Sequence, residues 1–430
     1  MRVEFKNLGI DENELDFLKS IYGDSLAWKD DLGGHLYMDY HAFVLSPDEH
    51  AMIVGAQNAI VRLLHKVQDI LRCDERLNEW LGMPEALWKE SMNKRINALT
   101  AYGRFDWMFD VKGELSLLEF NAETPMGWQE ALDWTLQLHK HYPKLACENF
   151  NLQFLLSESV KKSLKDQCIS EGARLCIVGD RCCAEEMETY ELLKRIIDYP
   201  VAEVLIGSIH NIKLLEGYDG LDDGLYLEVG ELLYPLDVLQ TFYSVEWMAY
   251  DSNVYDVDGN YVKNSLQQYI ENGAIKFVNP VSALQLHSKG LNALIWFLLN
   301  ETETLDDFKE VIYKYIPYTS FEKADFNELD MSRYVRKPLN EREGSNITIE
   351  NSIEGMFTSD EDEGYVFQEY VDSGVVFYQR ADSEFNRRFI EMKPTIGTYV
   401  VSDKFGGYFT RLAEGICSSS DATFLPTFVG

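Results

Sequence analysis

Two short strands joined by a glycine-containing turn constrain this chain more than any other segment. Residues 104–109 form one strand pattern, a turn follows at 110–113, and a second strand pattern covers 114–121. This order predicts an antiparallel hairpin. Because successive side chains of a strand point to opposite faces, Arg104 and Asp106 share one face of the first strand.

The register of the two strands decides whether the polar side chains of both strands meet. Glu119 shares a face of the second strand with Asn121. If the turn closes with Phe109 opposite Glu114, then Arg104 lies opposite Glu119, and opposite residues share a face. The predicted hairpin then gathers its acids, amide and arginine on one side, provided that no bulge changes the parity.

The side chains gathered in this way suit metal and phosphate chemistry. Asp106, Glu119 and Asn121 offer hard oxygen ligands, which Mg²⁺ prefers and commonly shares with substrate phosphates. Arg104 could balance the charge of a transferring phosphoryl group or of a substrate carboxylate. A hairpin with an ordinary polar outer face and one ion pair is the alternative interpretation.

Two later segments favour nucleotide binding. Lys337 precedes a small-residue turn that contains Gly344, and a lysine with nearby backbone N–H groups can contact phosphates. Gln368, Glu369 and Tyr370 end an apolar strand and could present backbone groups to an adenine. Each signal is weak alone, because the first is not a Walker A sequence and the second fits a plain edge strand.

The charge of the chain excludes some partners. Its 430 residues contain 39 Lys and Arg against 72 Asp and Glu, a formal net charge of −33. Such a surface repels nucleic acids and anionic lipids and could attract a cationic substrate such as a polyamine, although acidity also serves solubility alone. We therefore expect neither nucleic acid nor membrane as a partner.

Cysteine usage and hydropathy predict a cytoplasmic protein. The seven cysteines are odd in number and match no zinc or redox spacing, which is typical of reduced thiols. The N-terminus shows no apolar signal region. The apolar stretch at 291–299 is about half the ~20 residues that a membrane-spanning helix needs.

The remaining patterns predict a mixed α/β protein. Ser46 and Glu49 form a capping box before an amphipathic helix. An apolar strand at 173–178, a helix at 184–197 and a strand at 201–206 predict a β-α-β unit with parallel strands. Short strands separated by turn residues predict an antiparallel sheet near the C-terminus; they cover 366–370, 374–378, 397–401 and 407–411.

The order of the motifs resembles glutathionylspermidine synthases and their shorter relatives. The resemblance begins with Arg104-x-Asp106 and Glu119-x-Asn121-Ala122-Glu123-Thr124-Pro125 and covers roughly residue 101 to the end. The further matches, in order, are Leu236-Asp237-Val238, Glu246-Trp247-Met248, Ser288-Lys289, Arg336-Lys337-Pro338, Gly344-Ser345-Asn346, Phe367-Gln368-Glu369, 407–411 and Phe424-Leu425-Pro426.

This resemblance implies an ATP-grasp fold, in which two lobes clamp ATP. Residues 1–170 and 236–430 would form the synthetase region, and 171–235 a small β-α-β lobe like a pre-ATP-grasp domain. The namesake enzymes also carry an amidase domain, which we do not expect here.

The resemblance also assigns roles around the hairpin. Asp106, Glu119 and Asn121 would bind two Mg²⁺ ions, and Arg104 and Arg411 would stabilise the phosphoryl group in transit.

The same resemblance places the nucleotide and the substrates. Lys289, Lys337 and Gly344 would contact the phosphates of ATP, and 368–370 would line the adenine pocket. Further roles fall to Thr124, at the carboxylate substrate, and to Glu185 and Glu186, which would hold the amine; Glu188 is a rival for that last role.

The implied reaction is an ATP-dependent amide ligation. A carboxylate attacks the γ-phosphate to give an acyl phosphate, and an amine then displaces phosphate. Met126 and Leu412 depart from residues common in the relatives, so the identities of the acid and the amine stay open. A catalytically silent ATP-grasp module and an acidic binding protein unrelated to ATP are the alternatives.

Overall fold

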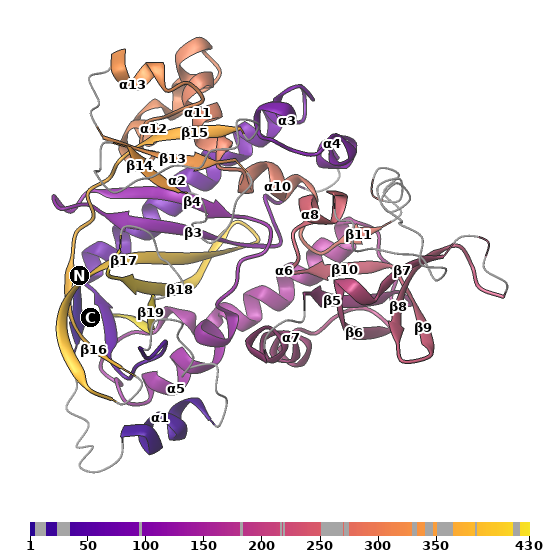
Figure 1. Cartoon of the computed structure of the whole chain (residues 1–430), viewed down its shortest axis with the longest axis horizontal. Coiled ribbons are helices and arrows are strands. Elements are labelled where there is room, and N and C mark those ends of the chain that lie inside the picture. The colour runs from indigo at the N-terminus through magenta and orange to yellow at the C-terminus, as the bar shows by residue number, and fades with distance from the viewer. Residues whose placement is uncertain are drawn as a thin grey trace.

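The computed structural model gives a mixed α/β architecture of several sheets surrounded by helices (Figure 1). It describes residues 1–4, 14–23, 35–93, 97–180, 184–215, 217, 220–250, 270, 275–328, 333–339, 347–350, 364–382, 385–415 and 422–430.

A central antiparallel sheet carries the predicted hairpin. β17 is long enough to pair with β16 through its first half and with β18 and β3 through its second half. The strands, in spatial order, are β19 (Thr423–Leu425), β18 (Lys404–Ala413), β17 (Arg387–Val401), β3 (Tyr102–Phe109) and β4 (Leu115–Asn121), with β16 (Val376–Ala381) beside β17.

A second antiparallel sheet lies next to the β3–β4 side of the central sheet (Figure 1). Its order is β12 (Thr319–Ser320), β15 (Tyr365–Glu369), β13 (Tyr334–Pro338) and β14 (Thr348–Glu350). The predicted strand at 366–370 corresponds to β15, so our prediction of one C-terminal sheet is wrong for this strand. The other three predicted strands lie together in the central sheet, because β16 and β18 both pair with β17.

Helices cover both sheets. α11 (Gly290–Glu301), the apolar stretch noted in the sequence, packs on β12 and β15, while α12 (Lys309–Tyr315) packs between α2 and β4. No helix in the described ranges combines the length and apolarity needed to cross a bilayer. The other helices near these sheets are α3 (Leu77–Trp80), α4 (Glu85–Ser91), α8 (Val245–Tyr250), α10 (Ser282–His287) and α13 (Ala324–Glu328).

The predicted long helix is α2 (Pro47–Leu71), and its capping box is confirmed. The Glu49 backbone N–H donates to Ser46 Oγ at 3.2 Å, and the Ser46 N–H donates to Glu49 Oε2 at 2.8 Å. The apolar positions at helical spacing, from Ile53 to Leu71, are fully buried against the central sheet.

The predicted β-α-β unit is confirmed as β5 (Arg174–Gly179), α7 (Ala184–Ile196) and β6 (Glu203–Ser208), with β5 and β6 parallel. The same parallel sheet includes β10 (Val238–Thr241) and β11 (Lys276–Phe277), which follow residue 235. The parallel sheet thus extends beyond the predicted lobe at 171–235, and the bounds of that lobe stay a prediction. A three-stranded sheet of β7 (Ile212–Leu215), β8 (Gly224–Val229) and β9 (Leu232–Leu236) flanks it.

The two ends of the chain lie together. β1 (Arg2–Glu4) and β20 (Thr427–Val429) flank β2 (Ala42–Leu45) in a small sheet. The helices on this side are α1 (Glu14–Tyr22), α5 (Thr135–His139) and α6 (Leu152–Asp166), and α5 continues from a π-helical turn at Glu130–Trp134.

Candidate active site

The β3–β4 hairpin forms with a different register from the predicted one. Phe109 lies opposite Leu115 rather than Glu114, an offset of one residue. A bulge after Asp106 adds a second residue of offset. Two single-residue offsets restore the parity of the pairing, so the side chains predicted to share a face still do.

The polar ends of the two strands consequently pair directly. Arg104 lies opposite Asn121, and Asp106 lies opposite Glu119. The amide Nδ2 of Asn121 donates to Asp106 Oδ2 and to Glu119 Oε1, both at 3.2 Å. The three predicted metal ligands therefore form one cluster.

Two arginines hold the Asp106 carboxylate. Arg104 donates from Nε to Oδ1 at 2.6 Å and from Nη2 to Oδ2 at 2.9 Å, while Arg411 Nη2 donates to Oδ2 at 3.2 Å. Arg411 reaches Asp106 from β18, across β17. The hydrogen-bonded arrangement brings both predicted phosphoryl-binding arginines to the metal-ligand cluster.

Glu119 is surrounded by cations. Lys289 Nζ, at the start of α11, lies 3.8 Å from Glu119 Oε2. Burial alone would raise the pKa of Glu119, but Lys289 and Lys337, followed by Asn121, lower it to about 2. The carboxylate is therefore ionised at neutral pH and both predicted phosphate-binding lysines lie within its electrostatic reach.

A cleft of about 800 Å³ of empty volume opens beside this cluster, between the central and the second sheet. We call it the inter-sheet cleft, and its lining residues are Asp106, Met108, Leu118, Glu119, Val335, Lys337, Ile347, Gln368, Glu369, Tyr370, Val371, Ser373, Lys393 and Thr395.

The predicted adenine segment lines this cleft, although two of its backbone donors are already bonded. The Glu369 N–H donates to the Tyr318 carbonyl at 2.7 Å, and the Tyr370 N–H donates to the Arg333 carbonyl at 3.4 Å. Gln368 accepts from Lys337 Nζ at 2.6 Å. These two N–H groups are therefore already engaged within the protein, contrary to the expectation that they face an adenine.

The loop after β4 contains Thr124 and is firmly held. Glu123 is buried and accepts from the Val245 N–H at 2.7 Å. The Met126 carbonyl accepts from Arg104 Nη1 at 2.9 Å and from Tyr399 Oη at 3.2 Å. The Met126 carbonyl therefore fixes the orientation of Arg104. Met126 lies two residues after Thr124, the predicted substrate residue.

Phe409 is a site residue that our sequence prediction missed. The guanidinium carbons of Arg104 and Arg411 lie 4.9 and 5.7 Å from the centre of its ring. Gly127 packs against the same ring with φ of +96°, where a Cβ would lie 2.5 Å from Phe409 Cε2. The signal was available, because Phe409 and Arg411 are two residues apart in a strand and share a face.

Glu130 is a second site residue that our sequence prediction missed. It lies in the π-helical turn, behind Arg104 and Arg411. It is 3% exposed and accepts from Tyr37 Oη at 2.5 Å. Burial raises the pKa of Glu130, against the lowering effects of Tyr37 and of Arg104 and Arg411. π-Helical turns are frequent at functional sites.

The predicted amine-binding acids lie elsewhere. Glu185 and Glu186 begin α7, which lies beside β5 and β6 and away from the second sheet (Figure 1). Glu186 Oε2 accepts from Tyr190 Oη at 3.1 Å, and it does not line the inter-sheet cleft. The side chain of Glu185 and the whole of Gly344 lie outside the described residues.

The donor set fits Mg²⁺ shared with a ligand better than a closed protein site. Within the described ranges, no three His, Cys, Asp or Glu side chains converge in a way that could hold a metal. Two carboxylates and one amide do converge at Asp106, Glu119 and Asn121, and Mg²⁺ commonly takes few protein ligands and completes its shell with phosphates and water.

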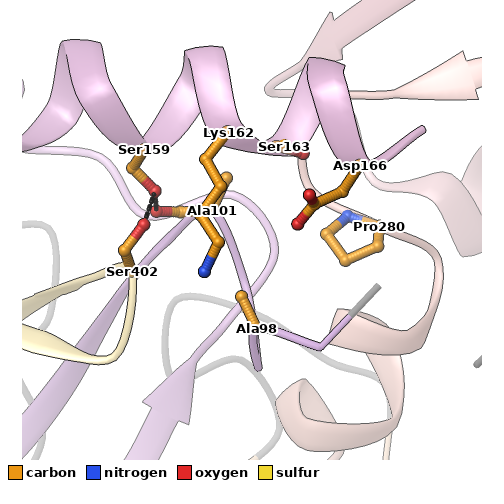
Figure 2. Close-up of a pocket in the computed structure, with 8 residues that line it drawn as sticks. All are labelled: Ala98, Ala101, Ser159, Lys162, Ser163, Asp166, Pro280 and Ser402. Carbon is orange, nitrogen blue, oxygen red and sulfur yellow. Dashed lines mark hydrogen bonds between the residues drawn. The ribbon is translucent and has the colours of Figure 1, made fainter. Parts of the chain in front are cut away.

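A second, smaller hollow of about 230 Å³ lies between α6 and the start of β3 (Figure 2). Ser159 and Ser402 are hydrogen bonded there at 2.7 Å, and Lys162 projects beside them. None of the predicted site residues lines this hollow.

The family match and the curated relative described below place the chain in the class of ATP-dependent carbon–nitrogen ligases with the ATP-grasp architecture. The chain belongs to the family described as glutathionylspermidine synthase preATP-grasp, whose model matches residues 12–430.

Two comparisons agree with this placement. A protein of Haemophilus influenzae, provisionally named an acid–amine ligase, is 25% identical over 343 residues, which cover 76% of this chain and 74% of that protein. The solved structure of a glutathione synthetase-like effector from Globodera pallida superposes with a TM-score of 0.60 at 12% identity, covering 99% of this chain and 100% of the effector. This second likeness concerns the fold alone.

Proposed function

We propose that this protein joins a carboxylate to an amine at the expense of ATP and Mg²⁺, through an acyl-phosphate intermediate. The observation that carries the proposal is the convergence of Asp106, Glu119 and Asn121 with two arginines beside the inter-sheet cleft. The family and the provisional name of the Haemophilus protein support the same class of reaction.

In this proposal ATP lies in the inter-sheet cleft with its adenine near 368–371 and its phosphates toward the hairpin. Lys337 and Lys289 contact the phosphates. Asp106, Glu119 and Asn121 would hold Mg²⁺, which would neutralise phosphate charge and orient the γ-phosphoryl group. Gly344 is a further proposed phosphate contact.

The protein contributes mainly position and charge. The substrate carboxylate, placed by the loop that contains Thr124, attacks the γ-phosphorus, and the bond to the β-phosphate oxygen breaks to release ADP. Arg104 and Arg411 stabilise the negative charge that spreads over the transferred group. The amine then attacks the acyl carbon, phosphate leaves, and the amine loses a proton to form the amide.

The amine is proposed to be cationic, such as a polyamine. The formal net charge of −33 supports this proposal, because an acidic surface concentrates cations. The acids at the start of α7, Glu185 and Glu186, stay candidates for holding the amine. Since they lie outside the inter-sheet cleft, the amine in this proposal approaches from the side of the parallel sheet.

The test is release of phosphate from ATP and Mg²⁺ with a panel of peptides and amines. Release that requires both an acid and an amine supports the ligase. The variants Asp106→Ala and Lys337→Ala should abolish release, whereas Lys162→Ala, beside the hollow of Figure 2, should not change it. Binding of ATP without release under any pairing would favour a catalytically silent nucleotide-binding module.

A further inference from the structure

We propose that Lys393 binds the α-phosphate of the nucleotide and so contributes to affinity for every adenine nucleotide, independently of the γ-phosphoryl group. This inference rests on the proposed function, because it assumes ATP in the inter-sheet cleft. Neither the sequence pattern nor the motifs indicated Lys393.

The position of Lys393 on β17 follows from the strand register. Gly397 lies opposite Asp106 of β3, and Thr395 lies opposite Arg411 of β18. Alternate residues of a strand share a face, so Lys393 lies on the face that carries Asp106 and Arg411.

The distance along β17 separates Lys393 from the phosphoryl-transfer end. Four residues from Gly397 to Lys393 correspond to roughly 13 Å at the rise of a β-strand. Lys393 lines the inter-sheet cleft, as do Tyr370, in the proposed adenine segment, and Ser373, which follows it. An ammonium there fits a group well removed from the γ-phosphate, and the α-phosphate is the anionic group that adjoins the nucleoside.

Lys393 differs from the other cations of the site because it forms no ion pair within the described residues. Lys289 faces Glu119, Lys337 donates to Gln368, and both arginines are held by Asp106. Lys393 is half-buried, and in the described part of the chain the structure gives it no ion pair and no hydrogen-bond acceptor. A cation that lines a cleft under these conditions is available to an anionic ligand.

The carboxylate substrate is a poorer partner for Lys393 than the nucleotide. The reacting carboxylate must reach the γ-phosphorus near Arg104 and Arg411, next to Phe409 and the loop that contains Thr124. Lys393 lies four residues along β17 from Gly397, which pairs with Asp106, and two residues from Thr395, which pairs with Arg411.

The test is the binding of adenosine, AMP, ADP and ATP, each with Mg²⁺, to the wild type, Lys393→Met and Lys393→Arg, measured by competition with a fluorescent ATP analogue. We expect Lys393→Met to weaken AMP, ADP and ATP alike by about tenfold, which corresponds to one charge-assisted hydrogen bond. Adenosine should bind the wild type and Lys393→Met equally. Lys393→Arg should recover most of the nucleotide affinity because it keeps the charge.

Three results would overturn the inference. Equal nucleotide affinities in Lys393→Met and wild type would remove the contact, and a loss confined to ATP would place it at the γ-phosphate. Unchanged nucleotide binding with a raised KM for the acid would assign Lys393 to the carboxylate. If the wild type binds no nucleotide at all, the proposed function itself fails, which is distinguishable from a failure of Lys393 alone.

Discussion

Arg104 grips Asp106 through two parallel hydrogen bonds, from Nε to Oδ1 at 2.6 Å and from Nη2 to Oδ2 at 2.9 Å. Both partners are almost completely buried, with the side chain of Arg104 8% and that of Asp106 2% exposed. Burial alone would lower the pKa of Arg104, but the neighbouring Asp106 more than reverses this effect and raises it. Arg104 therefore stays protonated at neutral pH.

This pairing couples the two halves of the proposed reaction centre. Arg411 also bonds Asp106 Oδ2, so both arginines are held by the carboxylate that we propose as a metal ligand. A cation bound to Asp106 weakens the hydrogen bonds between Asp106 and the two arginines, and an anion bound between the arginines weakens the same hydrogen bonds. Because such linkage is reciprocal, we expect the cation and the phosphoryl group to favour each other's binding.

Asp106→Asn should affect stability and turnover together. The substitution leaves the buried Arg104 without its counter-charge, which costs about 3 kcal/mol of unfolding free energy. It also removes a proposed Mg²⁺ ligand, so phosphate release should fall by about 10²-fold or more. Urea unfolding and phosphate release at saturating ATP measure the two effects.

Glu158→Gln, on the exposed side of α6, is the matched control for Asp106→Asn. Glu158 pairs with Lys161 at 3.3 Å on the surface, and exposed pairs contribute little. The control should unfold within about 0.5 kcal/mol of the wild type. Wild-type stability or turnover in Asp106→Asn would contradict the interpretation of the pair as a buried reaction element.

Gly127→Ala should damage the site through Phe409. Gly127 has φ of +96°, and an added Cβ would lie 2.5 Å from Phe409 Cε2. The ring supports Arg104 and Arg411, so we expect a loss of about 2–4 kcal/mol of unfolding free energy and a reduced rate of phosphate release.

Gly113→Ala separates the backbone effect from the packing effect. Gly113, in the β3–β4 turn, has φ of +81° but no neighbouring atom within 4 Å of an added Cβ. It should lose about 1 kcal/mol of stability and keep its phosphate release. Equal losses of phosphate release in the two variants would remove Phe409 from the argument.

The hairpin shows which part of the site could be predicted from sequence. Alternation placed Arg104 with Asp106 on one face of β3 and Glu119 with Asn121 on one face of β4, whereas the meeting of these faces also depends on the register. The exact partners could not be predicted, since turn closure and the bulge after Asp106 depend on packing beneath the strands. The predicted polar cluster forms nevertheless, because the two one-residue offsets together shift the pairing by two residues and leave the same side chains on one face.

Contacts between distant elements lay beyond the sequence pattern. Lys393 lies in a part of β17 that the pattern did not indicate, since the pattern predicted a strand only at 397–401. Glu130 resembles any helical glutamate in the sequence, and its burial comes from Tyr37, 93 residues away. Local propensity carries no information about such pairings, whereas the capping box at Ser46 is local and was predicted.

A buried ionic network at Asp39 should make the fold sensitive to acid. Arg387 donates to both carboxylate oxygens at 2.8 and 3.0 Å, and Tyr378 Oη donates at 2.5 Å. Burial alone would raise the pKa of Asp39, but His41 and Arg387 hold it well below its ordinary value. A carboxylate with a lowered folded-state pKa stabilises the fold above its unfolded pKa of about 3.9, and this contribution is lost as pH falls below it.

Asp39→Asn tests this network. At pH 7 it should cost about 3–5 kcal/mol of unfolding free energy, because Arg387 loses a buried partner. The difference from the wild type should shrink as pH falls from about 5 to 3, where the unfolded wild type takes up the proton. Urea unfolding over this range measures it, and a difference that is constant with pH would refute the assignment to Asp39.

Glu130→Gln should stabilise the protein at neutral pH, which is the opposite effect. Burial raises the pKa of Glu130 despite Tyr37, so the folded state holds this proton more tightly than the unfolded state does. The contribution of Glu130 is therefore fully favourable below the unfolded pKa of about 4.3 and declines as pH rises through the raised folded-state pKa. Glutamine keeps a carbonyl acceptor for Tyr37 Oη and carries no charge at any pH.

The stability gain of Glu130→Gln should consequently grow with pH. Unfolding free energies of the two proteins at pH 5 and pH 8 measure it, with Glu158→Gln again as the exposed control that shows no such trend. A variant that is less stable than the wild type at pH 8 would show that ionised Glu130 is favoured by Arg104 and Arg411 more strongly than burial disfavours it. That result would assign Glu130 to the charge network of the two arginines rather than to a neutral acid behind them.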